Sequence, residues 1–457
     1  MSIPFDDKLI SEAKKSAAIK NLETASIRQI KKLGDFIEEK TNEKILRMEM
    51  GIPGLPPVKE GIIGQVKSLT GYQGDDIEEK KLGEILNPRE SVAKTYPDIY
   101  GIEPLKKEMS RFIKNFLNLK IEPDYCIPTV GSMMGAFVVF LTMSKLYEKK
   151  NKILFIDPGF PVQKQQCEIL GIPYETFDVY EFRGEKLKKK LDSILKNGNF
   201  VGIIYSSPNN PTWITFTEEE LKIIGEMANQ YNVIVIEDLA YFGMDFRKDY
   251  SKPGEEPYQP TVANYTENFI LLISSSKVFS YAGERVAMLT ISEKVWNTES
   301  DDLKRYYRNF DKFGNALVYG TLYAVSSGVS HSTQYALYYL LKSVNEGKHN
   351  FVEGVREYGK RAKKMKELFT KYGFQIVYDK DGDEPIADGF YFTLTYPGMN
   401  TGKLLEELIR YGITAISLKI TGSEREGIRA CTSLIGLDKM ETLEERLKLF
   451  SENNPIV

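Results

Sequence analysis

The 457-residue sequence is poor in histidine and cysteine and has neither long apolar runs nor an excess of charge of one sign. The two histidines, His331 and His349, exclude a histidine-rich metal site and leave little room for Ser-His or Cys-His catalysis. The three scattered cysteines do not suggest a disulfide framework, so we expect a cytoplasmic protein. No run is long enough to cross a membrane and no signal peptide is recognisable. A net charge of −3 gives no reason to expect nucleic acid as a partner.

Short apolar segments alternate with helical patterns through the middle of the chain. The expected strands cover residues 152–156, 174–177, 201–205, 233–236, 269–273 and 286–291. Such alternation predicts an α/β fold with a mostly parallel central sheet and helices on both of its faces.

The two ends of the chain differ from this pattern. Helical spacing over 8–40 is followed by a Gly/Pro-rich passage at 50–57, and the pattern becomes α+β beyond about 295. Strands are expected in this last part at 389–395 and 414–418. We predict that residues 58–325 form a large domain. Residues 1–57 (helices and a crossing segment) and 326–457 are expected to build a smaller α+β domain from both chain ends.

Polar clusters follow four of the expected strands, at 157–160, 207–210, 238–241 and 274–277. Because ligands of such sheets bind beyond the carboxyl ends of the strands, we expect these clusters to converge on one crevice. Each cluster alone is also typical of an ordinary turn. Their joint placement favours a site.

The last cluster carries a lysine, Lys277, directly after a buried strand. Burial disfavours the ammonium form and lowers a lysine's pKa, and a neutral amine forms Schiff bases with carbonyl compounds. The neighbouring hydroxyls of Ser274 and Ser276, with Arg285 further on, suit a phosphate group. The competing interpretation is a solvated Ser/Lys loop.

Two further features suggest anion binding. Gly131-Ser132-Met133 begins a helix, where free backbone N–H groups can hold a phosphate, although an ordinary helix start has the same sequence. Arg429 lies in an apolar strand and needs an anionic partner there, which a structural ion pair would also supply.

Pyridoxal phosphate is one cofactor that would use all of these groups. It offers an aldehyde to a lysine, a phosphate to a helix start, a pyridine nitrogen to an acid, a 3-oxygen to donors and a ring face to an aromatic side chain. The residues able to meet these needs are Lys277, Ser132, Ser274, Ser276, Arg285, Asp238, Tyr241, Asn210 and Phe160.

From about residue 50 to 433 the sequence resembles the fold-type I, class I/II aminotransferases, which depend on pyridoxal phosphate and include the aspartate and aromatic aminotransferases. Asn210-Pro211-Thr212 matches the family's Asn-Pro-Thr-Gly, with Trp213 in place of the glycine. Asp238-x-x-Tyr241 follows at the family spacing, and Ser274-x-Ser276-Lys277 with Arg285 matches the Schiff-base segment. Ala287 replaces that segment's final glycine.

The resemblance implies a role for each matching residue. It makes Lys277, Asp238 and Tyr241 catalytic, and Arg429, Asn210 and Gly51 substrate-binding. The implied cofactor-binding residues are Lys277, Gly131, Ser132, Met133, Phe160, Asn210, Asp238, Tyr241, Ser274, Ser276, Arg285 and Tyr96. The Tyr96 counterpart reaches the other subunit's cofactor, so a homodimer with shared active sites is expected, and no metal is.

The expected activity moves an amino group between an α-amino acid and a 2-oxo acid such as 2-oxoglutarate, through a Schiff base on Lys277. A β-lyase or a synthase of the same fold is the alternative, because the cofactor motifs do not fix the fate of the carbanion. For a distal substrate carboxylate, Arg305, Arg308 and Lys312 are candidate partners, although a charged helix is usually solvated surface. Other candidates to shape the pocket are Gln163, Trp213, Tyr319 and Tyr323.

Overall fold

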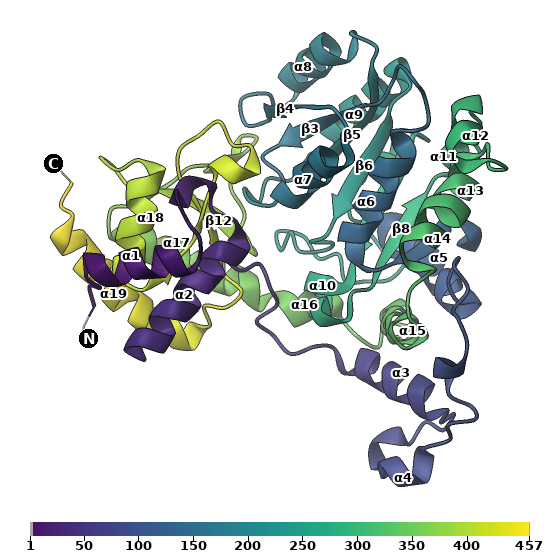
Figure 1. The fold of residues 1–457 in the computed structure, drawn as a ribbon, viewed down its shortest axis with the longest axis horizontal. Helices are drawn as coiled ribbons and strands as arrows, with labels where there is room; N and C mark the ends of the chain where they lie inside the picture. Colours follow the sequence, from purple (N-terminus) through teal and green to yellow (C-terminus); the bar gives the residue numbers. More distant parts are fainter. Residues whose placement is uncertain (1–2, 457) are drawn as a thin grey trace.

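The computed structural model describes residues 3–456, and in that range a seven-stranded sheet forms the centre of the larger body (Figure 1). The strand order is β2-β8-β7-β6-β5-β3-β4. The strands are β2 Cys126–Thr129, β3 Lys152–Asp157, β4 Tyr174–Asp178, β5 Phe200–Ser206, β6 Ile234–Leu239, β7 Phe269–Ser274 and β8 Ala287–Ile291. β8 runs antiparallel to both of its neighbours, and the other pairs are parallel, so the predicted mostly parallel sheet is confirmed.

Helices cover both faces of this sheet, as predicted. Successive residues of a strand point to opposite faces. Thus Leu271 and Ile273 belong to one buried core, with side chains of α5, α8, α9 and α15, while Ile270 and Leu272 belong to a second core with α6 and α7. These helices are α5 Glu103–Leu117, α6 Gly131–Met143, α7 Pro161–Leu170, α8 Glu185–Leu195, α9 Glu218–Tyr231 and α15 His331–Asn345.

The smaller body contains both ends of the chain (Figure 1). Its sheet has the order β14-β15-β12-β9, and β1 pairs with β13 beside it. The strands are β1 Leu46–Arg47, β9 Gln375–Ile376, β12 Tyr391–Thr395, β13 Ile413–Thr414, β14 Ile416–Ser417 and β15 Ile428–Cys431. The helices are α1 Asp7–Ser16, α2 Ile27–Thr41, α17 Glu357–Lys371, α18 Thr401–Arg410 and α19 Met440–Asn453. One apolar core joins α1 and α2 to the C-terminal elements.

One expected strand differs in the structure. The segment from Thr414 to Leu418 is split, because β13 pairs with β1 whereas β14 pairs with β15. The chain passes from one sheet to the other at Ala415. No glycine or proline lies there from which the break could have been predicted.

The remaining elements connect or flank the two bodies. They are α3 Lys59–Thr70, α4 Leu82–Ile85, α10 Ser275–Val278, α11 Glu293–Trp296, α12 Asp301–Tyr307, α13 Phe313–Asn315, the π-helix η7 Ala316–Leu322, α14 Tyr323–Ser326, α16 Phe351–Val355 and the hairpin of β10 Lys380–Asp381 with β11 Glu384–Pro385. Because α15 packs against α3 and α5, we propose that the large domain continues beyond the predicted boundary at residue 325 to the end of α15. In residues 3–456, no helix combines the length and apolar character needed to cross a bilayer.

Candidate active site

Lys277 lies in the short helix α10, immediately beyond the end of the central strand β7. The side chain of Ser274 caps this helix by accepting a hydrogen bond from the Ser276 amide at 3.2 Å. The Lys277 amine donates to the carbonyl oxygen of Gly51 in the crossing segment, and its Nζ lies 5.7 Å from the centre of the Phe390 ring. Burial lowers the pKa of Lys277 to about 8. The solvated-loop interpretation therefore does not hold, and burial favours the neutral form of the amine, which is the nucleophilic one.

Arg429 is 1% exposed in β15 and has no acidic partner among residues 3–456. Its Nη1 donates to Asn210 Oδ1 at 3.1 Å, and its Nη2 donates to the backbone oxygen of Glu49 at 2.6 Å. Its Nε has no hydrogen-bond partner. The structural ion pair that the sequence left open is absent from the described residues. A buried guanidinium held only by neutral oxygens retains the capacity to bind a carboxylate.

Tyr241 lies beyond the end of β6, and its hydroxyl donates to the hydroxyl of Tyr391 at 2.9 Å. Both side chains are buried. Burial raises the pKa of Tyr241 well above its usual value, so the phenol keeps its proton near neutral pH. Such a phenol is a hydrogen-bond donor rather than a base.

Asp238 is a buried carboxyl group in β6. Gln163 Nε2 donates to its Oδ2 at 2.8 Å, and the amide of Ala240 donates to its Oδ1 at 3.1 Å. Burial raises the pKa of Asp238 to about 6, and the two hydrogen bonds oppose that shift. A cationic ring nitrogen beside this carboxylate would offset the cost of burying its charge.

The start of α6 faces Arg285. Gly131 has φ of 73°, and a Cβ at this position would overlap the Arg285 guanidinium, so glycine allows the close approach. Ser132 and Met133 follow in the first turn of α6, where the free N–H groups of the helix lie. The Arg285 guanidinium and the start of α6 together suit a phosphate.

The two remaining predicted residues, Phe160 and Tyr96, are not among the fully buried side chains. Phe160 is half-buried and begins α7 after β3, at the same edge of the sheet as the other clusters. Tyr96 is 91% exposed on a segment whose Tyr100 ring lies 5.1 Å from that of Tyr319. Tyr96 thus faces outward on its own chain.

Trp213 lies at the position where the Asn-Pro-Thr-Gly motif of the aminotransferases has glycine, and its backbone has a φ of 68°. The side chain is fully buried, and its ring lies edge-on to Tyr241 at 5.4 Å and to Tyr391 at 6.4 Å. A Cβ on Gly389 would overlap the indole, so Gly389 makes room for it. Trp213 packs behind the tyrosines and fills the space beside them.

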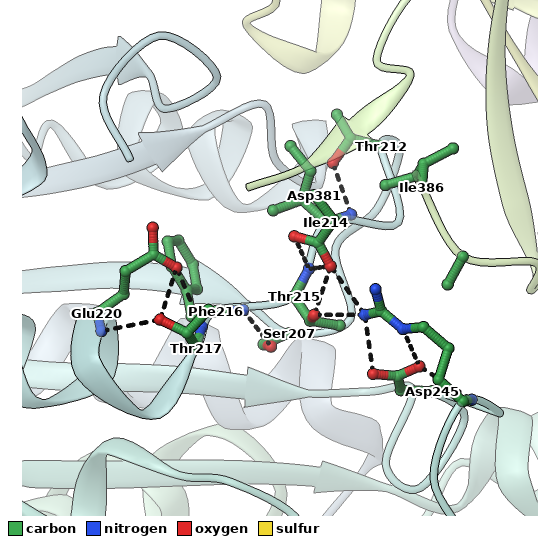
Figure 2. Close-up of polar contacts among 12 residues, drawn as sticks. Ser207, Thr212, Ile214, Thr215, Phe216, Thr217, Glu220, Asp245, Asp381 and Ile386 are labelled. Carbon is green, nitrogen blue, oxygen red and sulfur yellow. Dashed lines mark hydrogen bonds and ion pairs between the residues drawn. The ribbon is translucent and has the colours of Figure 1, made fainter. Parts of the chain in front are cut away.

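The loop that carries Asn210 and Trp213 is fixed by Asp381 of the β10–β11 hairpin (Figure 2). The carboxylate of Asp381 accepts from the amide of Thr215 at 3.2 Å and from its hydroxyl at 2.6 Å. It also pairs with Arg183 at 3.0 Å and Arg247 at 2.8 Å. A carboxylate distant in the sequence therefore positions this loop.

The candidate partners for a distal carboxylate lie on the surface. Arg305 is 58% exposed in its side chain and pairs with Glu148 and Asp302. Arg308 is also exposed, and Lys312 pairs with Glu299 at 3.8 Å. These groups belong to a solvated helix and its end, as the alternative interpretation expected.

Sequence reasoning missed Tyr391, Glu49 and Asp381 as members of this region. Tyr391 lies in a strand predicted over 389–395, but only the pairing of β12 with β15 brings it to Tyr241 and Arg429. Within residues 3–456 no group of acidic, histidine or cysteine side chains could hold a metal ion.

The family model described as "Aminotransferase class I and II" matches residues 72–431, and the chain belongs to this family. It is 27% identical over 201 residues to a probable aspartate aminotransferase of Methanocaldococcus jannaschii, covering 44% of this chain and 50% of the relative. An aspartate aminotransferase of Pyrococcus horikoshii is 26% identical over 200 residues, 43% of this chain and 47% of the relative. The matched stretch thus spans about half the length of these curated relatives.

Solved structures of the same fold cover nearly the whole chain. An aspartate aminotransferase of Thermotoga maritima superimposes with a TM-score of 0.71 at 17% identity, covering 98% of this chain and 100% of that one. An alanine aminotransferase of Pyrococcus furiosus gives a TM-score of 0.71 at 16% identity, with 96% and 99% covered. The fold-type I architecture predicted from the sequence is confirmed.

Proposed function

We propose that this protein is an aminotransferase that moves an amino group between an α-amino acid and a 2-oxo acid with pyridoxal phosphate bound at Lys277. The proposal rests on two buried basic side chains that lie near each other, Arg429 and Lys277. Arg429 is a buried guanidinium without a carboxylate partner in residues 3–456. Burial lowers the pKa of Lys277 to about 8, and the amine lies close enough to Arg429 to be affected by its charge. The first fits a substrate carboxylate and the second fits a cofactor aldehyde.

The residues present fit the cofactor at each of its groups. When bound, pyridoxal phosphate supplies an electron sink for the carbanion at the substrate α-carbon. Asp238, when ionised, would keep the pyridine nitrogen protonated. The side-chain oxygen of Asn210 accepts from Arg429, so the N–H groups of the same amide would donate to the 3-oxygen of the cofactor. The hydroxyl of Tyr241 would be a second donor to that oxygen.

The phosphate end uses a separate set of groups. Arg285 offers a guanidinium opposite the start of α6, and the hydroxyls of Ser132, Ser274 and Ser276 lie at the beginnings of α6 and α10. Met133 contributes a backbone N–H group in the same turn, and Phe160 is assigned to the ring face. These contacts would hold the cofactor while its aldehyde is engaged by Lys277.

The proton transfers are assigned to Lys277. The neutral amine of Lys277 would act as the base that removes the proton from the substrate α-carbon and as the acid that gives it back. Arg429, with Gly51 close by in the crossing segment, would orient the substrate carboxylate so that the α-C–H bond faces the lysine. The Lys277 amine donates to the Gly51 carbonyl, so these two groups lie together.

A substrate screen tests this function directly. Each of the twenty amino acids is mixed with the holoenzyme and 2-oxoglutarate, and formation of the matching 2-oxo acid and of glutamate is followed. We expect stoichiometric exchange for at least one amino acid. Release of ammonia and pyruvate without glutamate would instead identify a β-lyase.

We also propose a homodimer with shared active sites. Tyr96 is exposed, and the neighbouring surface carries further exposed apolar side chains: Tyr319, Tyr323 and Val325. Large exposed apolar surfaces are typical of subunit interfaces. If sites are shared, mixing inactive Lys277→Ala with inactive Tyr96→Ala restores activity in hybrid dimers. A fully active monomer in light scattering would overturn the dimer. The three cysteines are buried and free, in agreement with the cytoplasmic location that we propose.

A further inference from the structure

Tyr391 contacts both halves of the proposed site. Its hydroxyl lies 2.9 Å from that of Tyr241, on the cofactor side. Its ring faces the Arg429 guanidinium, with Cζ 4.5 Å from the ring centre, on the substrate side. A Cβ on Gly51 would overlap the Tyr391 hydroxyl, so this hydroxyl also reaches the crossing segment that holds Lys277.

We propose that Tyr391 is a positioning residue with two separable effects: its hydroxyl sets the strength of the hydrogen bond that Tyr241 gives to the cofactor, and its ring holds Arg429 in place for the substrate carboxylate. This inference rests on the proposed function. It assigns a role to a residue that the sequence motifs do not contain.

The hydroxyls of Tyr241 and Tyr391 each carry a single proton. A phenol has one proton to donate and can accept at its oxygen. In the structure Tyr241 donates its proton to Tyr391. When Tyr241 turns that proton to the cofactor 3-oxygen, its own oxygen becomes an acceptor, and Tyr391 can donate to it. A donor that itself accepts a hydrogen bond is strengthened, because successive bonds polarise one another.

These two hydroxyls should affect the pKa of the nitrogen that links Lys277 to the cofactor, and this pKa can be measured. The 3-oxygen of the cofactor is negatively charged. Its hydrogen bond with Tyr241 would be strongest when the nearby nitrogen of the lysine–cofactor linkage carries no proton, because no positive charge then offsets the charge of the oxygen. Donation therefore lowers the pKa of the linkage. Removal of the Tyr391 hydroxyl weakens the donor and should raise that pKa.

The Tyr391 ring should affect only substrate binding, because it contacts Arg429. Arg429 is held by two neutral oxygens, and the face of Tyr391 gives the buried guanidinium an additional favourable contact. Trp213 packs edge-on to the Tyr391 ring and restrains it. Loss of the ring should therefore weaken substrate binding, whereas loss of the hydroxyl alone should not.

Other ionisable groups around the tyrosine pair must be considered in a pH experiment. Arg429 and Cys431 lie near it in β15, and Lys277 of α10 lies near Cys431. Burial raises the pKa of Cys431 above its usual value of 9.0, so this thiol does not titrate between pH 5 and 8.5. The lysine is consumed in the linkage that is being measured.

The test compares Tyr391→Phe with a matched control, Tyr396→Phe. Tyr396 lies just beyond the same strand, and its buried ring also carries a hydrogen-bonded hydroxyl, which donates to the Asn454 backbone in the smaller body. Each holoenzyme is titrated with acid and base while the absorbance of the bound cofactor is recorded. Cofactor dissociation constants and kcat and KM are measured alongside.

We expect Tyr391→Phe to raise the linkage pKa by roughly 0.5 to 1 unit and to leave KM for the amino acid within about threefold. Tyr396→Phe should leave the titration unchanged. Tyr391→Leu, which also removes the ring, should raise KM by about tenfold in addition. An unchanged titration of Tyr391→Phe, or an equal shift in the control, overturns the role of the hydroxyl. An unchanged KM of Tyr391→Leu overturns the role of the ring.

These failures are distinguishable from failure of the proposed function. If the wild-type protein shows no titrating cofactor absorbance, or if Lys277→Ala retains it, the cofactor assignment itself is wrong. If the wild type titrates, Lys277→Ala does not, and Tyr391→Phe matches the wild type, only the further inference is wrong.

Discussion

The guanidinium of Arg429 and the side-chain amide of Asn210 meet at 3.1 Å across the junction of the two bodies. Arg429 belongs to β15 of the smaller body, and Asn210 belongs to the loop after β5 of the larger one. One hydrogen bond therefore couples the proposed substrate-carboxylate site to a proposed cofactor contact. Asn210 provides its oxygen to one and keeps its N–H groups for the other.

Replacement of Arg429 by glutamine should affect the substrate and spare the cofactor. The variant loses a charged, two-pronged contact to a carboxylate, so we expect KM for the amino acid to rise by about a hundredfold. The cofactor dissociation constant should change by less than about threefold. Steady-state kinetics and cofactor titration measure the two quantities.

Arg425→Gln is the matched control for this change. Arg425 lies four residues earlier in the chain and pairs on the surface with Glu181. A surface pair contributes little, so its kinetics should match the wild type. Equal KM values for Arg429→Gln and the control would remove Arg429 from the substrate site.

Asp238→Asn should abolish most of the turnover. Without a carboxylate beside it the pyridine nitrogen is not held protonated, and losing one partner of a buried charge pair typically costs about 2–5 kcal/mol, which corresponds to at least about a thirtyfold fall in kcat. Glu237→Gln is the control. Glu237 points to the other sheet face, where it accepts from Tyr205 and Thr261, and its loss should leave kcat within about threefold.

The local parts of this account were predictable from the sequence. Lys277 and Asp238 follow strands whose apolar pattern is continuous, and their partners in each motif lie a few residues away. Contacts between distant segments were not predictable in this way. Tyr391 reaches Tyr241, and Asp381 reaches Thr215, only because strands of the smaller body are packed against loops of the larger one.

The same distinction explains two other outcomes. Arg429 was recognised as needing an anion, but only the folded chain shows that its partners in residues 3–456 are neutral oxygens. The split at Ala415 depends on which strand each half pairs with, and no local signal records that choice.

Asp381→Ala should destabilise the junction of the two bodies. It removes a buried carboxylate that satisfies Thr215 and pairs with Arg183 and Arg247, so we expect the free energy of unfolding to fall by about 2–4 kcal/mol. Urea unfolding measures the change. Asp383→Ala, in the same hairpin but exposed, should shift stability by less than about 0.5 kcal/mol. Indistinguishable unfolding of the two variants would contradict the positioning role.

Glu237 should make stability fall as pH rises. Burial raises its pKa from 4.5 to about 7. The folded protein therefore holds a proton that the unfolded chain releases between these values, so the contribution is complete below pH 4.5 and lost as pH rises through about 7.

Unfolding of the cofactor-free protein at several pH values tests this linkage. Wild type should lose roughly 1–3 kcal/mol more than Glu237→Gln between pH 4.5 and 7.5, since the variant has no proton to release at this position. Parallel stability profiles for the two proteins would mean that Glu237 does not titrate in this range.

The central claim, that Lys277 alone binds the cofactor aldehyde, is tested most directly by locating the attachment. The purified protein is mixed with pyridoxal phosphate, the linkage is fixed by borohydride reduction, and the modified lysine is identified by peptide mass spectrometry. We predict stoichiometric modification at Lys277 and its loss in Lys277→Ala. Label spread over surface lysines, or retained at full stoichiometry in Lys277→Ala, would contradict the account.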